Sequence, residues 1–428
     1  MTDETGDSNM NLKNMTIYSI FVRNHGGTFE AVRRDVARIR SLGVDTIWLL
    51  PIHPIGKVQR KGTLGSPYAI SDYRAVNPEY GTLEDFKRLA DEIHNQGMKL
   101  MIDVVFHHTS PDSVLVRQHP EWFYRKEDGS FGNHVGDWSD VIDLDFDSEG
   151  LSAYLIDTLK MWAHIVDGFR CDVAPMVPLN FWLDARWAVE EVRPGCIWLA
   201  ESVEPGFVRY NRNHGIVCHS DAEMYQAFDI CYDYDVYDDY RRYLKGEEPL
   251  DAYIAALERQ ECIYPDNYVK LRNLENHDRP RAAFMIPDEK ARRNWLVFNF
   301  LQKGAALLYD GQEWEPVHRP GLFDADPVRM EGEAPLSALI RRLTALKKEE
   351  IFSEGVYSLH ALPNDWVKIC YQRREEKLLA FVSLQGKNGL LNAELPEGSY
   401  RDLLTGRDVL VEEGLISSPG EPVVLRIG

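Results

Sequence analysis

Apolar and polar positions follow two different periods between residues 15 and 345. Segments 30–43 and 83–97 carry apolar residues at helical spacing, and each ends at a glycine. The runs that separate such segments are short and rich in β-branched and aromatic residues, and the run 44–54 is nearly all apolar, as a strand buried on both faces is. This regular alternation of strands and amphipathic helices predicts parallel βαβ units.

The strand candidates number eight, which is the number that closes a (β/α)8 barrel. They lie at 15–25, 44–54, 99–110, 168–173, 196–202, 227–236, 268–278 and 304–314. Such a barrel takes about 250 residues, so a chain of 428 residues has room for insertions and a further small domain. We therefore predict an α/β fold, a (β/α)8 TIM barrel with an insertion after strand 3 and a C-terminal antiparallel β-sandwich.

Two departures from this rhythm divide the chain. Residues 109–145 are rich in Trp, Tyr, His, Gly and Asp and show no clear period, which indicates an insertion on the carboxyl side of the barrel. From residue 350 onwards, short strand candidates separated by turn residues predict a compact antiparallel β-domain. The predicted parts are a polar N-terminal extension at 1–14, the barrel at 15–108 and 146–345, an inserted subdomain B at 109–145, and a C-terminal β-domain at 350–428.

Composition is that of an ordinary globular protein, with 44% hydrophobic and 27% charged residues. The formal net charge of −20 argues against nucleic acid and against an anionic membrane as partners. This charge agrees with a neutral or cationic ligand, and equally with a surface that only keeps the protein soluble.

Nothing in the chain has the pattern of a targeting or membrane segment. Residues 1–14 are polar and acidic, without the apolar centre of a signal peptide, and no run of about 18 apolar residues occurs. The six cysteines show neither CxxC spacing nor a disulfide framework. We therefore expect a cytoplasmic protein, unless a native signal peptide precedes this sequence.

Three of the predicted strands end at a carboxylate. Asp172 ends the run GFRCD, Glu201 follows the run WLA, and Asp278 ends the segment LENHD. The carboxyl ends of barrel strands meet at one face, which holds the active site in enzymes of this fold. Two carboxyl groups that face each other are the minimum equipment for cleaving a glycosidic bond.

The neighbours of these carboxylates suggest different protonation states. Arg170 and Asp172 are two residues apart on one strand, so their side chains point to the same side, and we expect the arginine to keep Asp172 ionised. Glu201 follows an apolar run, and desolvation would raise its pKa, as suits a general acid. The alternative is a structural ion pair and a residue at the start of a helix, but carboxylates at three strand ends together favour an active site.

At these positions the sequence resembles the α-amylase family of retaining glycoside hydrolases. The segments DVVFHHT at 103–109, GFRCD at 168–172, LAES at 199–202 and NHD at 276–278 match motifs of the family in order and spacing. GVDTIWLLP and GAALLYDGQE match further signatures, and the resemblance covers the barrel and fits the C-terminal domain.

The resemblance implies roles for single residues. Asp172 would be the nucleophile and Glu201 the general acid/base. Asp278 would bind sugar hydroxyls, and this binding would become stronger in the transition state. Tyr68 matches the aromatic residue that stacks on the sugar ring, and Asp103 would support the arginine of the sugar subsite. The implied substrate-binding residues are Tyr68, Asp103, His108, Arg170 and His277.

The sequence departs from the family where many members bind calcium. His107 stands in place of an asparagine, Asp172 is not followed by Lys-His, and residues 23–30 lack a carboxylate-rich run. Calcium prefers oxygen ligands, so we predict no metal and no cofactor, with a structural calcium near Asp143 as the alternative. A transition-metal pair of His107 and His108 is disfavoured, because adjacent side chains of a strand point to opposite faces.

The sequence therefore predicts a retaining α-glycoside hydrolase that acts on maltooligosaccharides or starch-like α-glucans, with an α-linked gluco-oligosaccharide as its partner. An α-glucosidase or a transglycosylase on the same scaffold is the alternative, and an inactive carbohydrate-binding homologue is a more remote one. Linkage, chain length, endo or exo action and oligomeric state stay open at this point.

Overall fold

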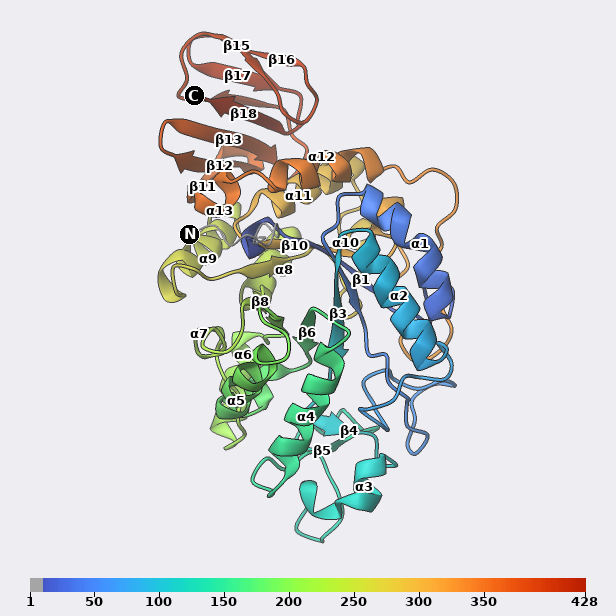
Figure 1. Cartoon of the computed structure of the whole chain (residues 1–428). Helices are drawn as coiled ribbons and strands as arrows, with labels where there is room; N and C mark the ends of the chain where they lie inside the picture. The colour runs from blue at the N-terminus through green and yellow to red at the C-terminus, as the bar shows by residue number, and fades with distance from the viewer. Residues whose placement is uncertain (1–10) are drawn as a thin grey trace.

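Eight parallel strands form a closed barrel at the centre of the computed structural model, which describes residues 11–428 (Figure 1). The strands are β1 (Thr16–Ile20), β2 (Thr46–Leu49), β3 (Lys99–Val104), β6 (Gly168–Cys171), β7 (Ile197–Ala200), β8 (Ile230–Tyr232), β9 (Lys270–Arg272) and β10 (Ala305–Tyr309). Their order around the barrel is β1-β10-β9-β8-β7-β6-β3-β2, so neighbours in space follow the order along the chain. The predicted fold class is confirmed, and each of the eight strand candidates contains one barrel strand.

The barrel strands are shorter than the apolar runs that predicted them. Every residue of β1, β2, β6, β7 and β10 is buried, as expected for strands covered on both faces. The first run was expected at 15–25, but pairing ends at Ile20, and Phe21 and Val22 are buried in the loop that follows. The pattern of apolar residues indicates which residues are buried. In this barrel the chain stays buried beyond the last hydrogen bond between strands, so the apolar run is longer than the strand.

Helices surround the barrel, and their starts follow local capping rules (Figure 1). In α1 (Phe29–Ser41) the Thr28 side chain accepts a hydrogen bond from the N–H of Ala31, and α2 (Leu83–Asn95) begins with a capping box of Thr82 and Asp85. The remaining helices outside the insertion are α4 (Leu151–Ala163), α5 (Leu179–Glu190), α6 (Pro205–Asn213), α7 (Asp221–Met224), α8 (Tyr237–Leu244), α9 (Leu250–Ile263), α10 (Ala282–Met285), α11 (Glu289–Leu301), α12 (Ser337–Lys347) and α13 (Ile351–Glu354).

The insertion leaves the barrel after β3 and forms the lower end of the molecule in Figure 1. It contains the short helix α3 (Val114–Gln118), and its two ends are held together by β4 (His108–Thr109) and β5 (Ile142–Asp143). These strands pair antiparallel, with His108 opposite Asp143. The base of the insertion is therefore fixed beside the carboxyl end of β3.

The C-terminal strands build an antiparallel domain at the opposite end of the molecule (Figure 1). They are β11 (Val356–Leu362), β12 (Trp366–Arg373), β13 (Glu376–Ser383), β14 (Gly389–Asn392), β15 (Gly398–Arg401), β16 (Asp408–Val411), β17 (Leu415–Ser418) and β18 (Val423–Ile427). The sheet β11-β12-β13-β18 and the pairs β14-β17 and β15-β16 enclose a core around Trp366 and Phe381. The other face of β13 packs against α11 through alternate residues such as Leu378 and Ala380.

Two remaining expectations concern the ends and the membrane. Of the predicted extension at 1–14, residues 1–10 lie outside the described part, and Leu12–Asn14 form a turn of 3-10 helix. The Asn14 side chain donates a hydrogen bond to the carbonyl of Glu349, 2.8 Å away. Within residues 11–428 no helix combines the length and the apolar character needed to cross a bilayer.

Candidate active site

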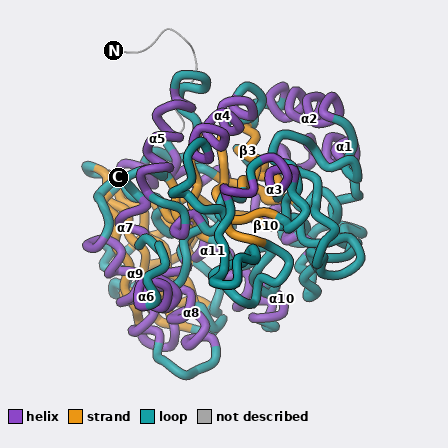
Figure 2. The backbone as a smooth tube through the Cα atoms, turned by 90° about the horizontal axis from the view of Figure 1, so that it is seen from below, coloured by secondary structure: helices purple, strands orange, loops and turns teal. Residues whose placement is uncertain are grey.

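The carboxyl ends of the barrel strands open toward the insertion, and Figure 2 looks at the molecule from that side. Asp172 is the first residue after β6, and its N–H bonds the carbonyl of Val104 at 2.9 Å. Glu201 is the first residue after β7, and its N–H bonds the carbonyl of Cys171 at 3.0 Å. The ladder thus continues one residue beyond each strand and fixes both backbones side by side.

Arg170 joins the carboxylates at the centre of this face. Its Nη1 lies 2.8 Å from Oδ1 of Asp172 and 2.9 Å from Oδ1 of Asp103, and its Nη2 lies 3.0 Å from Oε2 of Glu201. The guanidinium is wholly buried and lies 5.2 Å from the ring centre of Trp48. The expected placement of Arg170 beside Asp172 is therefore found. Nη1 donates to Asp103 and Asp172, and Nη2 lies within ion-pair distance of Glu201.

Tyr68 and His277 extend this network to the third strand-end carboxylate. The Tyr68 hydroxyl donates to Oδ2 of Asp103 at 3.1 Å and lies 2.7 Å from Nε2 of His277. The same nitrogen lies 3.0 Å from Oδ2 of Asp278, and the rings of Tyr68 and His277 are stacked. The Asp278 side chain is 38% exposed, so the network is buried at Arg170 and opens toward solvent at Asp278.

The carboxyl groups of the site differ in proton affinity. Burial raises the pKa of Glu201 to about 8, although Arg170 opposes it. Desolvation alone would raise the pKa of Asp278, but the charge and hydrogen bond of His277, together with the charges of Arg170 and Arg279, lower it to about 2. Burial also raises the pKa of Asp172, whereas Arg170 and a hydrogen bond from Glu201 lower it. Desolvation is the largest of these effects and opposes the expectation that Arg170 keeps Asp172 ionised.

Two contributors to the site were missed from the sequence. The hydroxyl of Tyr232, the last residue of β8, accepts a hydrogen bond from Nε of Arg170 at 3.2 Å. The N–H of Val173 donates to Oε2 of Glu201 at 2.8 Å, and Val173 has a φ of 36°, a left-handed conformation that is costly for a β-branched residue. Inward alternation along 227–236 could have indicated Tyr232, whereas a backbone donor leaves no signal in the sequence.

The insertion forms one wall beside the carboxylates. An apolar cluster joins Val173 and Met176, which follow β6, to Val203 and Val208, which follow β7. Trp138 of the insertion packs against this cluster. An apolar surface of this kind next to the carboxylates can exclude water from the reacting groups and raise carboxyl pKa values.

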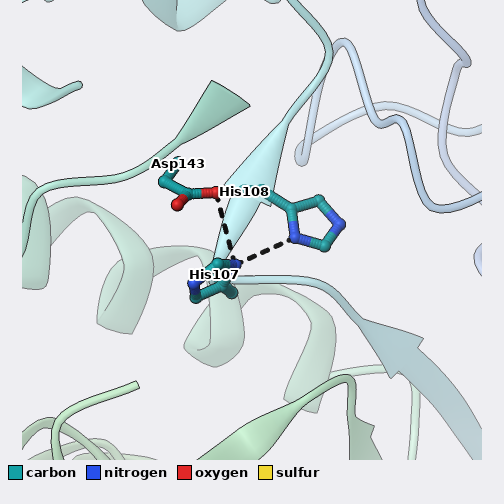
Figure 3. A group of neighbouring side chains, drawn as sticks. All are labelled: His107, His108 and Asp143. Atoms are coloured by element: carbon teal, nitrogen blue, oxygen red, sulfur yellow. Dashed lines mark hydrogen bonds and ion pairs between the residues drawn. The ribbon is translucent and has the colours of Figure 1, made fainter. Parts of the chain in front are cut away.

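His108 does not take part in the network that the other seven predicted site residues form. It lies in β4, and its Nδ1 is 3.1 Å from Nδ1 of His107. Together with Asp143 these histidines form a buried group in the described chain whose donor atoms all lie within 4.8 Å of one another (Figure 3). Burial lowers the pKa of each histidine to about 4, so both rings are neutral at pH 7.

The argument that adjacent histidines point to opposite faces is wrong for this pair. His107 lies at a bend between β3 and β4, outside either strand, so the alternation of a strand does not apply to it. In Figure 3 the His107 ring contacts both Asp143 and the ring of His108. His107, His108 and Asp143 are therefore the residues that could hold a metal ion in the described chain.

Comparisons with known proteins agree on one family. The model described as the catalytic domain of alpha amylase matches residues 3–121 and 112–333, and that of the bacterial alpha amylase C-terminal domain matches residues 358–425. The α-amylase MalA of Haloarcula japonica is 27% identical over 417 residues, which cover 91% of this chain. The match covers only 58% of the length of MalA.

Solved structures of similar length share the whole architecture. An α-amylase from Lactobacillus plantarum is 47% identical with a TM-score of 0.96, and the match covers 98% of this chain and 100% of that one. A noncanonic maltogenic α-amylase, AmyB, from Thermotoga neapolitana is 34% identical with a TM-score of 0.86, and covers 98% of this chain and 99% of its own.

Proposed function

This chain belongs to the α-amylase family, and on that premise we propose that it is a retaining glycoside hydrolase of α-glucosidic bonds in maltooligosaccharides or starch-like α-glucans. The observation that supports this best is the network around Arg170, which joins Asp172 and Glu201 at adjacent strand ends. The resemblance drawn from the sequence motifs is confirmed at the level of the family. The maltogenic description of one solved relative supports short maltooligosaccharides as substrates.

The proposed reaction uses the two carboxyl groups in sequence. Asp172 attacks the anomeric carbon as a carboxylate, while Glu201 gives its proton to the departing glycosidic oxygen, so that a covalent glycosyl-enzyme forms. Water then attacks the same carbon, Glu201 takes a proton from it, and Asp172 is released as a carboxylate. A Glu201 pKa of about 8 keeps this proton in place at pH 7, and the fixed hydrogen bond from Val173 holds the carboxyl in position.

Asp278, His277 and Tyr68 would hold the sugar ring next to these groups. A pKa of about 2 keeps Asp278 ionised, and a partly exposed carboxylate can accept hydrogen bonds from sugar hydroxyls. Tyr68 presents an aromatic ring whose position is fixed by its hydroxyl contacts and by stacking on His277. These side chains suffice for the chemistry, so we propose that no cofactor takes part in the catalytic steps.

The proposed cytoplasmic location is supported by the cysteines. All six are free thiols in the structure, and Cys171, Cys196, Cys218 and Cys231 are buried as small apolar side chains. Thiols that are left unpaired agree with a reducing compartment. Cell fractionation with an antibody against the protein would test this location directly.

The proposed roles are tested with two aspartates that flank the same strand. Asp172→Asn should abolish turnover of maltoheptaose while the protein stays folded, because the amide keeps the volume and loses the nucleophilic charge. The matched control is Asp167→Asn, which removes the carboxylate before β6, where it pairs with His94 at 2.7 Å and Arg193 at 2.8 Å. The control should lower the melting temperature and leave kcat within about twofold.

Product analysis separates the proposed hydrolysis from the alternatives. Proton NMR during the first turnovers should show the α-anomer, as retention of configuration requires. The β-anomer as first product, or full activity in Asp172→Asn, would contradict the mechanism. Products longer than the substrate would identify a transglycosylase, release of single glucose units an α-glucosidase, and sugar binding without any turnover an inactive homologue.

A further inference from the structure

Three buried donor groups meet where the insertion joins the barrel (Figure 3). We propose that His107, His108 and Asp143 bind a divalent transition-metal ion of the zinc class, which ties β5 of the insertion to the segment that follows β3. This site is distinct from the catalytic carboxylates, and the inference does not depend on the proposed activity.

The spacing of the donor atoms agrees with tetrahedral zinc. Two ligands about 2.0–2.2 Å from a tetrahedral zinc ion lie about 3.3–3.6 Å apart. Nδ1 of His107 lies 3.1 Å from Nδ1 of His108 and 3.6 Å from Oδ1 of Asp143. The first distance is slightly below the expected edge, and the second is at its upper end. His108 and Asp143 offer donor atoms within 4.8 Å of each other, so these side chains must rotate to close the third edge around an ion. Three protein ligands leave one coordination position for water.

Asp143 supplies an oxygen that has no other partner. Its side chain is buried, and Oδ2 accepts hydrogen bonds of 2.7 Å from both the backbone N–H and Nδ1 of His134. Oδ1 is also buried and has no hydrogen-bond partner among the described residues. His134 thus fixes the carboxylate in an orientation that presents Oδ1 to the histidine pair, as outer partners of metal ligands commonly do.

The contact between the two histidines is the remaining alternative to metal binding. A direct hydrogen bond between the two histidines would explain their 3.1 Å contact, but it would leave Oδ1 of Asp143 buried and unpaired.

Calcium does not fit the same donors. A calcium ion takes six to eight oxygen ligands at about 2.3–2.6 Å, whereas two of the three donors here are imidazole nitrogens. Trp138 lies against both rings, with centroid distances of 5.9 Å to His107 and 5.4 Å to His108. The aromatic ring covers space that a large ion would need for further oxygen ligands.

The test measures metal directly, on the full chain and apart from turnover. The purified protein is stripped with EDTA, dialysed and titrated with zinc or calcium, and bound metal is counted by mass spectrometry. We expect one equivalent of zinc, a melting temperature higher by several degrees with zinc, and no comparable rise with calcium. Cobalt in place of zinc should give the strong visible absorption of a four-coordinate ion with nitrogen ligands.

Variants assign the ion to these residues. His107→Asn and Asp143→Asn should each lose stoichiometric zinc, whereas His53→Asn should keep it, because His53 is an equally buried histidine that bonds the carbonyl of Ala75 at 3.0 Å. The proposal is overturned if the unaltered protein binds less than one equivalent of zinc, or if both site variants retain zinc. A rise in melting temperature with calcium instead of zinc would also overturn it. If a variant does not fold, the metal count and the cobalt spectrum of the unaltered protein decide the question.

Discussion

The raised pKa of Glu201 leads to a prediction about the alkaline side of the pH profile. If Glu201 is the general acid, kcat/KM for maltoheptaose should fall above pH 8, by about tenfold for each further pH unit. The direction follows from the chemistry, because deprotonation removes the proton that the departing oxygen needs. Glu201→Gln should remove this alkaline limb, since the amide does not titrate and still accepts the hydrogen bond of Val173.

The raised pKa of Glu201 determines how much of the enzyme carries the catalytic proton at pH 7. With a pKa of about 8 the carboxyl is protonated in about nine molecules of ten at pH 7. At its ordinary value of 4.5 it would be protonated in about three of a thousand, so burial enriches the active form about 300-fold. Loss of the acid itself should cost about 10²–10⁴ in kcat on maltoheptaose.

The assay compares two substrates that differ in leaving group. Maltoheptaose has a sugar alkoxide to protonate, whereas α-maltosyl fluoride releases an ion that needs little protonation. We expect Glu201→Gln to be severely impaired on maltoheptaose but to release fluoride at a near-normal rate in the first turnover, because that step needs no acid. Later turnovers should be slow, since the variant also lacks the base that activates water. An alkaline limb that persists in Glu201→Gln, or a midpoint below about pH 6 in the unaltered enzyme, would refute the reasoning. The observed midpoint belongs to the coupled carboxyl cluster rather than to one group.

Two further changes test the network and the C-terminal domain. Arg170→Lys should lower kcat by about 10²–10³ with the fold intact, because one ammonium group cannot replace a guanidinium that reaches Asp103, Asp172 and Glu201. Activity near that of the unaltered enzyme would contradict this prediction. Trp366→Ala should cost about 3–5 kcal/mol of unfolding free energy, measured by denaturant titration, because Trp366 is wholly buried in the core of the C-terminal domain. A loss below about 1 kcal/mol would show that this core collapses without strain.

The parts of the fold that could be predicted are those that local hydrophobic periodicity determines. Strand β10 is apolar along its whole length, and α1 and α2 carry helical spacing and end just before glycines, so type and order followed from the sequence. The ends of the strands did not follow, because residues such as Val22 are buried in loops and look the same in sequence as paired strand residues.

The active site could be predicted where a side chain ends a strand. Asp172 and Glu201 each follow an apolar run directly, and two-residue alternation placed Arg170 beside Asp172. The proton affinity of Asp172 could not be predicted in this way, because it depends on desolvation by elements distant in sequence. The hydrogen bond from the N–H of Val173 could not be predicted either. It results from a strained backbone conformation, and nearly every residue has a backbone N–H.

Tyr68 connects the catalytic network to the proposed metal site, and this affects how variants of His108 are interpreted. The hydroxyl of Tyr68 contacts Asp103 and His277, while its backbone lies near the ring of His108. Asp103 and His108 also belong to one short segment that runs from β3 into β4. A change at His108 can therefore displace Tyr68 and lower activity without any contact between His108 and sugar. Activity loss in a His108 variant supports a sugar-binding role only if its metal content is unchanged; a parallel loss of zinc assigns the effect to the support of Tyr68.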